Sequence, residues 1–345
     1  MVNRLNNYLI MMSIATATLV SSSCTKSLSD TASDESVMLF GVESTQTKVN
    51  YDGVEADFEK GDELGLYAFY NNFYYYYNEY ASFAESVIFA NHGLTIDESK
   101  NATYSPLRTW TFSTLYGTAP HTLDVVAYYP FKTGYNEDYV VMVYDEDDGA
   151  ATLEYYYVND DGDINNVDYM TACTRYDYSA KTDEFREAML GLEYIPLSFT
   201  RQTASLNFKI TKPEDYETEI IVKGVEVTFD AYKKMTQTIG ASSTVTWSDM
   251  TENYSLTTST TCSATLAETV YDYTPSEDVT PTVVDDLLSD EQLLFFPPGT
   301  EIWKIVFTLT DDGEEKEYTW HAHVDEIFAN THYTLNLELD PSRAN

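Results

Sequence analysis

The most unusual side chains of the sequence form an aromatic run that could bind carbohydrate. Tyr74, Tyr75, Tyr76 and Tyr77 follow one another inside residues 69–83, a segment rich in Tyr and Phe. A tyrosine ring offers rigid apolar area and a hydroxyl with little conformational entropy to lose, so such a run can stack on sugar rings of a host or bacterial surface. The alternative is a strand or extended loop whose rings pack on a neighbouring sheet.

An acidic segment has part of the spacing of a calcium loop. Asp161, Asp163 and Asn165 match the first three ligand positions of such a loop. Asn166 stands where the loop requires glycine, and Ala172 stands where it requires an acid. The sequence therefore favours a solvated turn here.

Two histidines lie close enough in the sequence to share a metal ion. His321 and His323 lie two apart on one face of a predicted strand, yet no third ligand can be named, so a solvated face is the commoner explanation.

The sequence contains no Gly-x-Ser-x-Gly, phosphate-binding glycine loop, His-Glu-x-x-His or Cys-x-x-Cys. We predict no cofactor and no enzymatic activity, although two carboxylates that the sequence cannot locate would suffice for glycoside hydrolysis.

The first cysteine, Cys24, is a candidate for lipidation. An apolar run over residues 8–20 follows Arg4, with the length of a signal-peptide core and too few residues to span a bilayer. Three serines precede Cys24, an arrangement that resembles a bacterial lipobox, in which the cysteine is acylated and becomes the mature N-terminus. We predict a signal peptide over residues 1–23, a lipid (palmitate) anchor in the outer membrane and a polar linker over 24–36. Plain secretion is the alternative.

The other two cysteines, Cys173 and Cys262, show no disulfide framework. They could pair outside the cytosol, but two lone cysteines far apart in the sequence are better explained as two small buried thiols.

The charge of the chain excludes one class of partner. The 345 residues include 57 Asp and Glu against 19 Lys and Arg, which gives a net charge of −38. Nucleic-acid binding requires clustered basic side chains, and the sequence has no such cluster. Direct attraction to an anionic membrane surface is disfavoured for the same reason.

The strands that must position these residues change face near the middle of the chain. Between 195 and 199 the apolar side chains are odd-numbered, and between 206 and 210 they are even-numbered. Because strand side chains alternate with period two, the two runs cannot share one regular strand and one core. The break at 200–203 predicts a seam between two β-domains, over residues 37–200 and 201–345.

Composition and turn signals predict an all-β chain. Tyr (30) and Phe (16) are abundant, which favours pleated surfaces. Asp-Gly turns at 145–150 and 311–314 predict hairpins, and only 181–192 has helical character. Strands at such spacing without intervening helices indicate two antiparallel sandwiches.

Five segments, taken in order, resemble the fimbrillin family of Bacteroidetes. They are Gly61–Ala68, Leu123–Pro130, Asp168–Ala172, Ile195–Ile210 and Tyr333–Leu339. The resemblance implies two transthyretin-like β-sandwich domains in tandem, export as a lipoprotein and assembly into a surface fimbria, the type V pilus. In that family a trypsin-like protease removes the first strand, and a neighbouring subunit donates a strand in its place. Main-chain hydrogen bonds and side-chain pockets would hold the donor strand.

The chain departs from this family pattern at both ends. No arginine lies between Cys24 and Arg108, so either Lys48 serves as the processing site or the anchor stays attached. The residues after Leu339 are few and polar, which leads to the hypothesis of a terminal subunit, at a tip or an anchor. We expect a fimbrial, adhesive subunit at the cell surface. The alternatives are a surface lipoprotein that captures glycans without polymerising and, less favoured, a secreted glycosidase.

Overall fold

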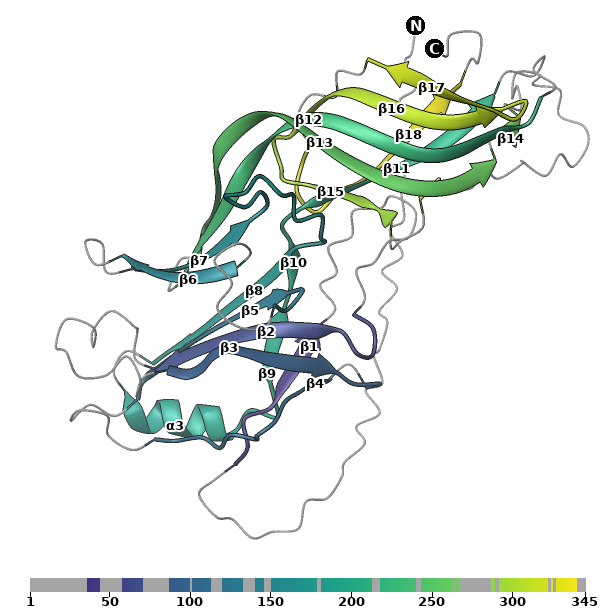
Figure 1. Cartoon of the computed structure of the whole chain (residues 1–345). Coiled ribbons are helices and arrows are strands. Elements are labelled where there is room, and N and C mark those ends of the chain that lie inside the picture. The colour runs from purple at the N-terminus through teal and green to yellow at the C-terminus, as the bar shows by residue number, and fades with distance from the viewer. Residues whose placement is uncertain are drawn as a thin grey trace, which may run out of the picture. The chain divides into compact units, whose positions relative to one another are not determined.

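Strands make up most of the chain wherever its structure is described. The computed structural model describes residues 36–43, 58–70, 87–99, 101–112, 120–132, 140–145, 150–178, 181–212, 218–239, 243–263, 265–266, 287–288, 292–321, 324 and 327–339. Residues 36–345 form one unit by their internal contacts. The predicted all-β fold class is confirmed (Figure 1).

The elements follow in this order: β1 (Phe40–Glu43), β2 (Glu63–Tyr70), β3 (Val87–Ile96), β4 (Asn101–Thr103), β5 (Thr122–Tyr129), β6 (Val140–Asp145), β7 (Ala150–Tyr156), β8 (Met170–Asp177), α3 (Thr182–Leu190), β9 (Ile195–Ser198), β10 (Thr200–Arg201), β11 (Ala204–Lys212), β12 (Ile220–Thr238), β13 (Val245–Ser263), β14 (Thr265–Leu266), β15 (Leu294–Phe296), β16 (Glu301–Asp311), β17 (Glu314–Trp320) and β18 (His332–Glu338). The helix falls within the segment predicted to be helical.

An eight-stranded sheet contains the earlier strands, in the order β10-β8-β5-β2-β3-β4-β1-β9. Strands β9 and β10 stand at opposite ends of this order, yet Phe199 alone separates them in the chain. The sheet must therefore curl back on itself, and it encloses one hydrophobic core. The helix α3 adds Phe185 and Met189, both fully buried, to that core and lies beneath the sheet in Figure 1.

Strand β5 is buried on both faces, as its nearly continuous apolar sequence predicts. Leu123, Val125 and Ala127 belong to the core inside the curled sheet. Val126 and Tyr128 point the other way, into a second and larger core. The eight-stranded sheet is thus covered on its outer face as well.

The second core lies between two further sheets. In one, β11 pairs with β15 and β14 along one edge and with β18 along the other. In the other, the long strands β12 and β13 pair with each other, and β12 also pairs with β16, which pairs with β17. The edge-on contact of Phe208 with Phe307, 5.5 Å between ring centroids, joins the two layers.

Both predicted hairpins form. Strands β6 and β7 pair antiparallel on either side of the first Asp-Gly sequence. At the second, β16 and β17 flank Asp312 and Gly313, whose φ angles of 51° and 80° are those of a type I′ turn. Strand β12 contains a bulge at Gly224, a register shift against both β13 and β16.

The sheets depart from a purely antiparallel arrangement. Strand β1 pairs in parallel with β9, and β11 pairs in parallel with β14 and β18. Parallel pairing requires a long connection, and the chain segments between these partners are long enough to provide it.

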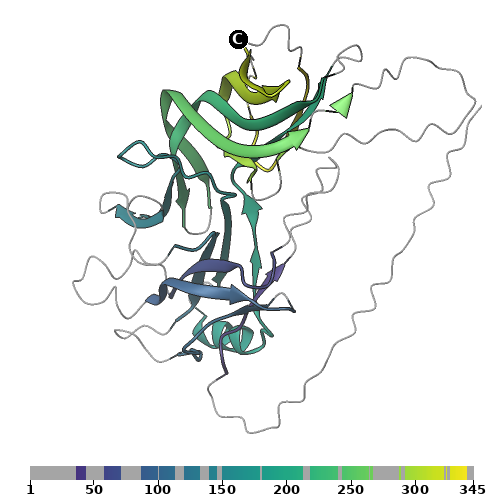
Figure 2. The same cartoon turned by 45° about the vertical axis from the view of Figure 1, so that its right-hand side comes forward.

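The predicted change of face at 200–203 is confirmed. Ile195, Leu197 and Phe199 belong to the core of the eight-stranded sheet, and Leu206 and Phe208 belong to the second core. The continuous run from β9 to β11 connects the two (Figure 2). Pairing also crosses this point, because β7 pairs with β12. The division into domains at residue 200 stays a prediction.

Candidate functional site

The first described strand, β1, lies in the interior of the eight-stranded sheet. All four of its residues pair in parallel with β9, and its first two pair antiparallel with β4. The pairing extends upstream, where the Met38 N–H donates to the Arg108 carbonyl at 2.9 Å and the Trp110 N–H donates to the Ser36 carbonyl at 3.0 Å. A strand with partners on both edges leaves two open edges when it is removed.

The inward side chains of this segment are fully buried. Met38 is 0% exposed and Phe40 is 2% exposed. The Phe40 ring makes edge contacts with Phe89 and Tyr104, at 5.6 and 5.8 Å between centroids. The Tyr104 hydroxyl donates to the Met38 carbonyl at 2.7 Å. Each such side chain contributes about 1.5–3 kcal/mol by its burial. We call this position, between β4 and β9 and over Phe89 and Tyr104, the β1 slot.

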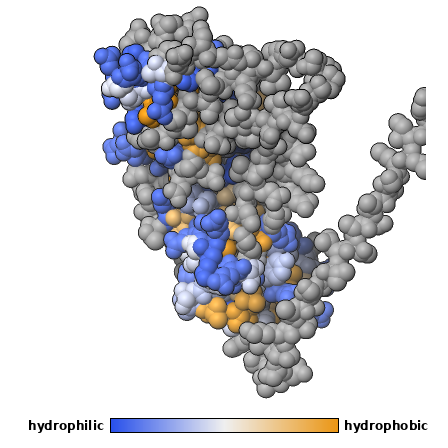
Figure 3. Space-filling view, turned by 90° about the vertical axis from the view of Figure 1, so that its right-hand side faces the viewer, coloured by the Kyte–Doolittle hydropathy of each residue, from blue (hydrophilic) through white to orange (hydrophobic). Residues whose placement is uncertain are grey.

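The outward side of the β1 slot is partly apolar. Of the large apolar side chains exposed in the described residues, Leu39, Leu107 and Tyr194 border the start of β1. Figure 3 colours one face of the molecule by hydropathy and shows hydrophobic residues gathered low on it. At the end of β1, the Ser198 hydroxyl donates to the Glu43 carboxylate at 3.0 Å on the surface.

The last strand, β18, has an edge position instead. Its seven residues pair in parallel with β11, which is its one partner among the described strands. Its side chains are half-buried or exposed, and only Leu339, just after the strand, is fully buried. At its start, His332 Nδ1 lies 2.8 Å from the Ser205 hydroxyl. Strand β18 is therefore held by backbone pairing along a single edge and by Tyr333, Leu335 and Leu337, which are partly buried against the second core.

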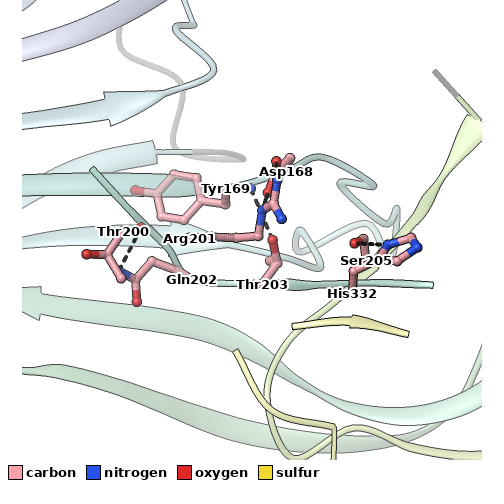
Figure 4. A network of polar contacts seen from close by, with 8 residues as sticks. All are labelled: Asp168, Tyr169, Thr200, Arg201, Gln202, Thr203, Ser205 and His332. Carbon is pink, nitrogen blue, oxygen red and sulfur yellow. Dashed lines mark hydrogen bonds and ion pairs between the residues drawn. The ribbon is translucent and has the colours of Figure 1, made fainter. Parts of the chain in front are cut away.

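Polar contacts fasten the seam between β10 and β11 (Figure 4). Arg201 Nε and Nη2 each donate to the Asp168 carboxylate at 2.6 Å, a bidentate ion pair that is largely buried. The Tyr169 N–H donates to the Thr203 hydroxyl at 3.2 Å, and the Gln202 N–H donates to the Tyr169 carbonyl at 2.8 Å. Burial raises the pKa of Asp168, and the Arg201 charge opposes that rise.

A second buried carboxyl lies on β5. Asp124 is 2% exposed and stands opposite Arg175 on β8, whose Nη1 lies 3.4 Å from Asp124 Oδ1. Burial raises the pKa of Asp124 to about 6, although the Arg175 charge lowers it, and Asp177 raises it further. Each of these two carboxyls, Asp124 and Asp168, is thus paired with an arginine on a neighbouring strand.

A family model described as fimbrillin-like matches residues 47–345, which is most of the sequence. The chain belongs to the fimbrillin-like family. This confirms the resemblance read from the five ordered segments. No curated protein matches the chain.

Solved structures similar to this fimbrillin-like chain include three from Bacteroides. One is a candidate cell adhesion protein of Bacteroides uniformis, 16% identical, with a TM-score of 0.44 over 91% of this chain and 96% of the other. Another is a fimbrial protein of Bacteroides vulgatus, 14% identical, with a TM-score of 0.45 over 88% and 95%. A third is a candidate cell adhesion protein of Bacteroides ovatus, 13% identical, with a TM-score of 0.43 over 90% and 93%.

Several predicted site residues of the fimbrillin-like chain lie outside the described residues. These are Cys24 with the signal peptide and nearly all of the linker, Lys48, and the four tyrosines 74–77. The predictions made for them stay predictions. Within the described part, no helix is long and apolar enough to cross a membrane.

The acidic segment that resembled a calcium loop forms a tight turn. The Asp163 N–H donates to the Asn159 side-chain oxygen at 2.7 Å, and the Gly162 N–H donates to the Asn159 carbonyl at 3.0 Å. Asp160 and Asp161 are exposed. Among the described residues, no three side chains that could bind a metal ion lie together.

The remaining candidates are separated in the structure or only partly described. His321 is exposed just after β17, and His323 lies outside the described part. Cys173 is half-buried on β8. Cys262 lies on β13 by its backbone, and its side chain is not among those that the structure describes. Sequence reasoning missed the contact of His332 with Ser205 and that of Gly41 with Tyr194, because both join residues more than one hundred positions apart. No local pattern signals such pairs.

Proposed function

We propose that this fimbrillin-like chain is a structural and adhesive subunit of a cell-surface fimbria, assembled by donor-strand addition. The observation that carries the proposal is the β1 slot. A four-residue strand occupies an interior position of the sheet, and two fully buried side chains lie in its segment. Removal of that strand would expose two strand edges and an apolar pocket together.

A strand from a neighbouring subunit would restore both features. Its backbone would pair with β4 and β9, as β1 does, and its alternate side chains would fill the places of Met38 and Phe40. Main-chain hydrogen bonds would supply affinity, and the pockets would supply register. The partners we propose are therefore other fimbrial subunits.

Export and processing are further parts of the proposal. We propose a lipid anchor at Cys24 in the outer membrane and cleavage after Lys48, which would release the β1 segment. Two transthyretin-like sandwiches, divided near residue 200, are the arrangement we propose for the mature subunit. Family membership favours a structural role over a catalytic one. Glycan capture by the four tyrosines remains a prediction from the sequence.

Mass spectrometry of the protein from its native membrane tests processing. A mature N-terminus at residue 49, with fimbrillin-like subunits co-purifying, would support a processed subunit. An acylated Cys24 on an intact chain with such companions would support an anchor subunit. An acylated Cys24 with no companion subunit would contradict fimbrial assembly and favour a glycan-binding lipoprotein.

Strand replacement itself is tested with the full chain carrying a specific protease site inserted after Lys48. After cleavage, a fluorescent peptide of residues 36–43 should enter the β1 slot and displace the cleaved segment. The matched control is the same peptide with Phe40→Ala, which removes the buried ring and should bind roughly 100-fold more weakly. Equal binding of both peptides, or of neither, would contradict donor-strand addition at this slot.

A further inference from the structure

At Gly41, one aromatic ring covers the outward side of the β1 slot. Gly41 follows Phe40 and faces away from the core, yet it is buried. A β-carbon placed on Gly41 would lie 2.6 Å from Tyr194 Cδ2, 2.8 Å from Cε2 and 3.1 Å from Cγ. Real side chains do not approach so closely, so the Tyr194 ring occupies the space that any residue other than glycine would need.

The ring cannot yield to a side chain by a small adjustment. One of the close atoms is Cγ of Tyr194, which is bonded to the β-carbon of Tyr194 itself. The ring can therefore move away from Gly41 only by rotation about the first side-chain torsion of Tyr194. The backbone beside it is held, because the Ile195 N–H donates to the Leu39 carbonyl at 2.7 Å. Tyr194 is 40% exposed and has a surface to rotate into, but β1 would then lose its cover.

We propose that Tyr194 is a specificity gate of the β1 slot, which admits only a strand with glycine at the position of Gly41. The inference rests on the proposed strand replacement and names the partner more narrowly. The donor strand would carry a large apolar side chain, any residue, an aromatic side chain, glycine and a medium-sized apolar side chain in succession. This is the pattern of residues 38–42.

The gate excludes the last strand of a second copy of this chain as donor. Tyr333, Leu335, Leu337 and Leu339 alternate with polar residues, and the segment contains no glycine. If this strand entered the slot with its apolar side chains directed inward, one of its polar residues would face the Tyr194 ring. That residue would be a threonine, an asparagine or a glutamate, whichever way the strand runs. A second copy therefore cannot fill the β1 slot with its last strand, and this subunit does not polymerise through β18 alone.

The gate can be tested in the intact chain, without any strand exchange. Valine favours strands more than glycine does, so Gly41→Val would be neutral or stabilising if nothing blocked it. With Tyr194 in place, the substitution should lower the urea midpoint of unfolding, since overpacking destabilises. In the Tyr194→Ala background, the same substitution should leave the midpoint unchanged or raise it. A lowered midpoint of equal size in both backgrounds would overturn the gate.

The partner specificity is tested in the cleaved chain described above. The peptide of residues 36–43 should bind, and its Gly41→Val variant should bind roughly 10- to 100-fold more weakly. A peptide of residues 332–339 should show no measurable binding. Tyr194→Ala in the receptor chain should restore binding of the valine peptide to within a few-fold of the original.

The outcomes separate the gate from the proposed function. If the original peptide binds and the valine peptide binds equally well to the unchanged receptor, the gate is wrong and strand replacement stands. If the original peptide itself fails to bind, strand replacement is wrong, and the unfolding midpoints of the intact variants still decide whether Tyr194 excludes a side chain at position 41. Binding of the 332–339 peptide would overturn the conclusion that a second copy cannot donate β18.

Discussion

The strands nearest the two ends of the described chain, β1 and β18, are held in opposite ways. Strand β1 has four residues, partners on both edges and two fully buried side chains in its segment. Strand β18 has seven residues, one partner among the described strands, and side chains that are half-buried or exposed. The shorter strand thus depends on fully buried side chains, and the longer one depends on a single row of backbone pairs and on partly buried side chains.

This difference shows where strand replacement could be specific. A backbone row accepts many sequences, because every residue except proline has the same donor and acceptor. A pocket distinguishes side chains by size and shape. The β1 slot combines a pocket inside with a ring outside, so the identity of its occupant matters at several positions. The position of β18 beside β11 imposes a weaker requirement, because Tyr333, Leu335 and Leu337 are only partly buried against the second core.

The largest test of this comparison is a matched truncation in each strand. Phe40→Ala should lower the free energy of unfolding by about 3–5 kcal/mol, because it empties a closed pocket beside Phe89 and Tyr104. Leu335→Ala should cost about 1–2 kcal/mol, because Leu335 is only half-buried at an edge. Urea unfolding of both variants measures the two losses. Equal losses would show that the two strands are held alike.

The seam that joins the two strands' sheets offers the next test. Arg201→Ala should lower the free energy of unfolding by about 3 kcal/mol, because it leaves the largely buried Asp168 carboxylate without its counter-charge. Arg201→Lys is the matched control; it keeps the charge, loses the bidentate geometry and should cost less. Hydrogen exchange of β1 and β18 in each variant shows whether the sheets still open together. An alanine variant as stable as the original would mean that the pair contributes nothing.

Buried polar groups distinguish the two sheets as well. In the sheet of β18, Asn207 is neutral, and its amide both donates to and accepts from the backbone of Leu288. In the sheet of β1, Asp124 has a raised pKa of about 6. The native state then binds this proton more tightly than the unfolded chain, whose aspartate has a pKa near 3.8. The contribution of Asp124 to the free energy of unfolding is therefore complete below about pH 4 and is lost as the pH rises through about 6.

Asp124→Asn should remove that pH dependence. The free energy of unfolding of the original chain, relative to the variant, should fall by on the order of 2–3 kcal/mol between pH 4 and pH 7. Urea unfolding at both pH values measures the difference. Asp161→Asn, which removes an exposed carboxylate, controls for the change in net charge. An unchanged difference between pH 4 and pH 7 would mean that Asp124 is ionised throughout.

The sequence predicted what depends on local pattern. The alternation around Thr200, the doubly buried β5 and the Asp-Gly turn at Gly313 follow from period two, from a continuous apolar run and from turn chemistry. The parallel pairing of β1 with β9 and the ring of Tyr194 over Gly41 depend on residues about 150 positions apart. Period and composition carry no information about which distant strands meet, so the β1 slot became visible only in the structure.

The smallest expected effect tests whether the polar contact of Glu43 at the end of β1 stabilises this strand. Ser198→Ala removes the hydroxyl that donates to Glu43 at the surface, and it should cost about 0.5 kcal/mol or less, because exposed pairs exchange one solvated contact for another. Ser198→Thr is the matched control, since it keeps a hydroxyl on the same strand. If the alanine variant instead lost as much stability as Phe40→Ala, the polar end of β1 would stabilise the strand as strongly as its pocket does. A donor strand would then be selected by its residue at the Glu43 position as well as by the side chain that it places in the pocket.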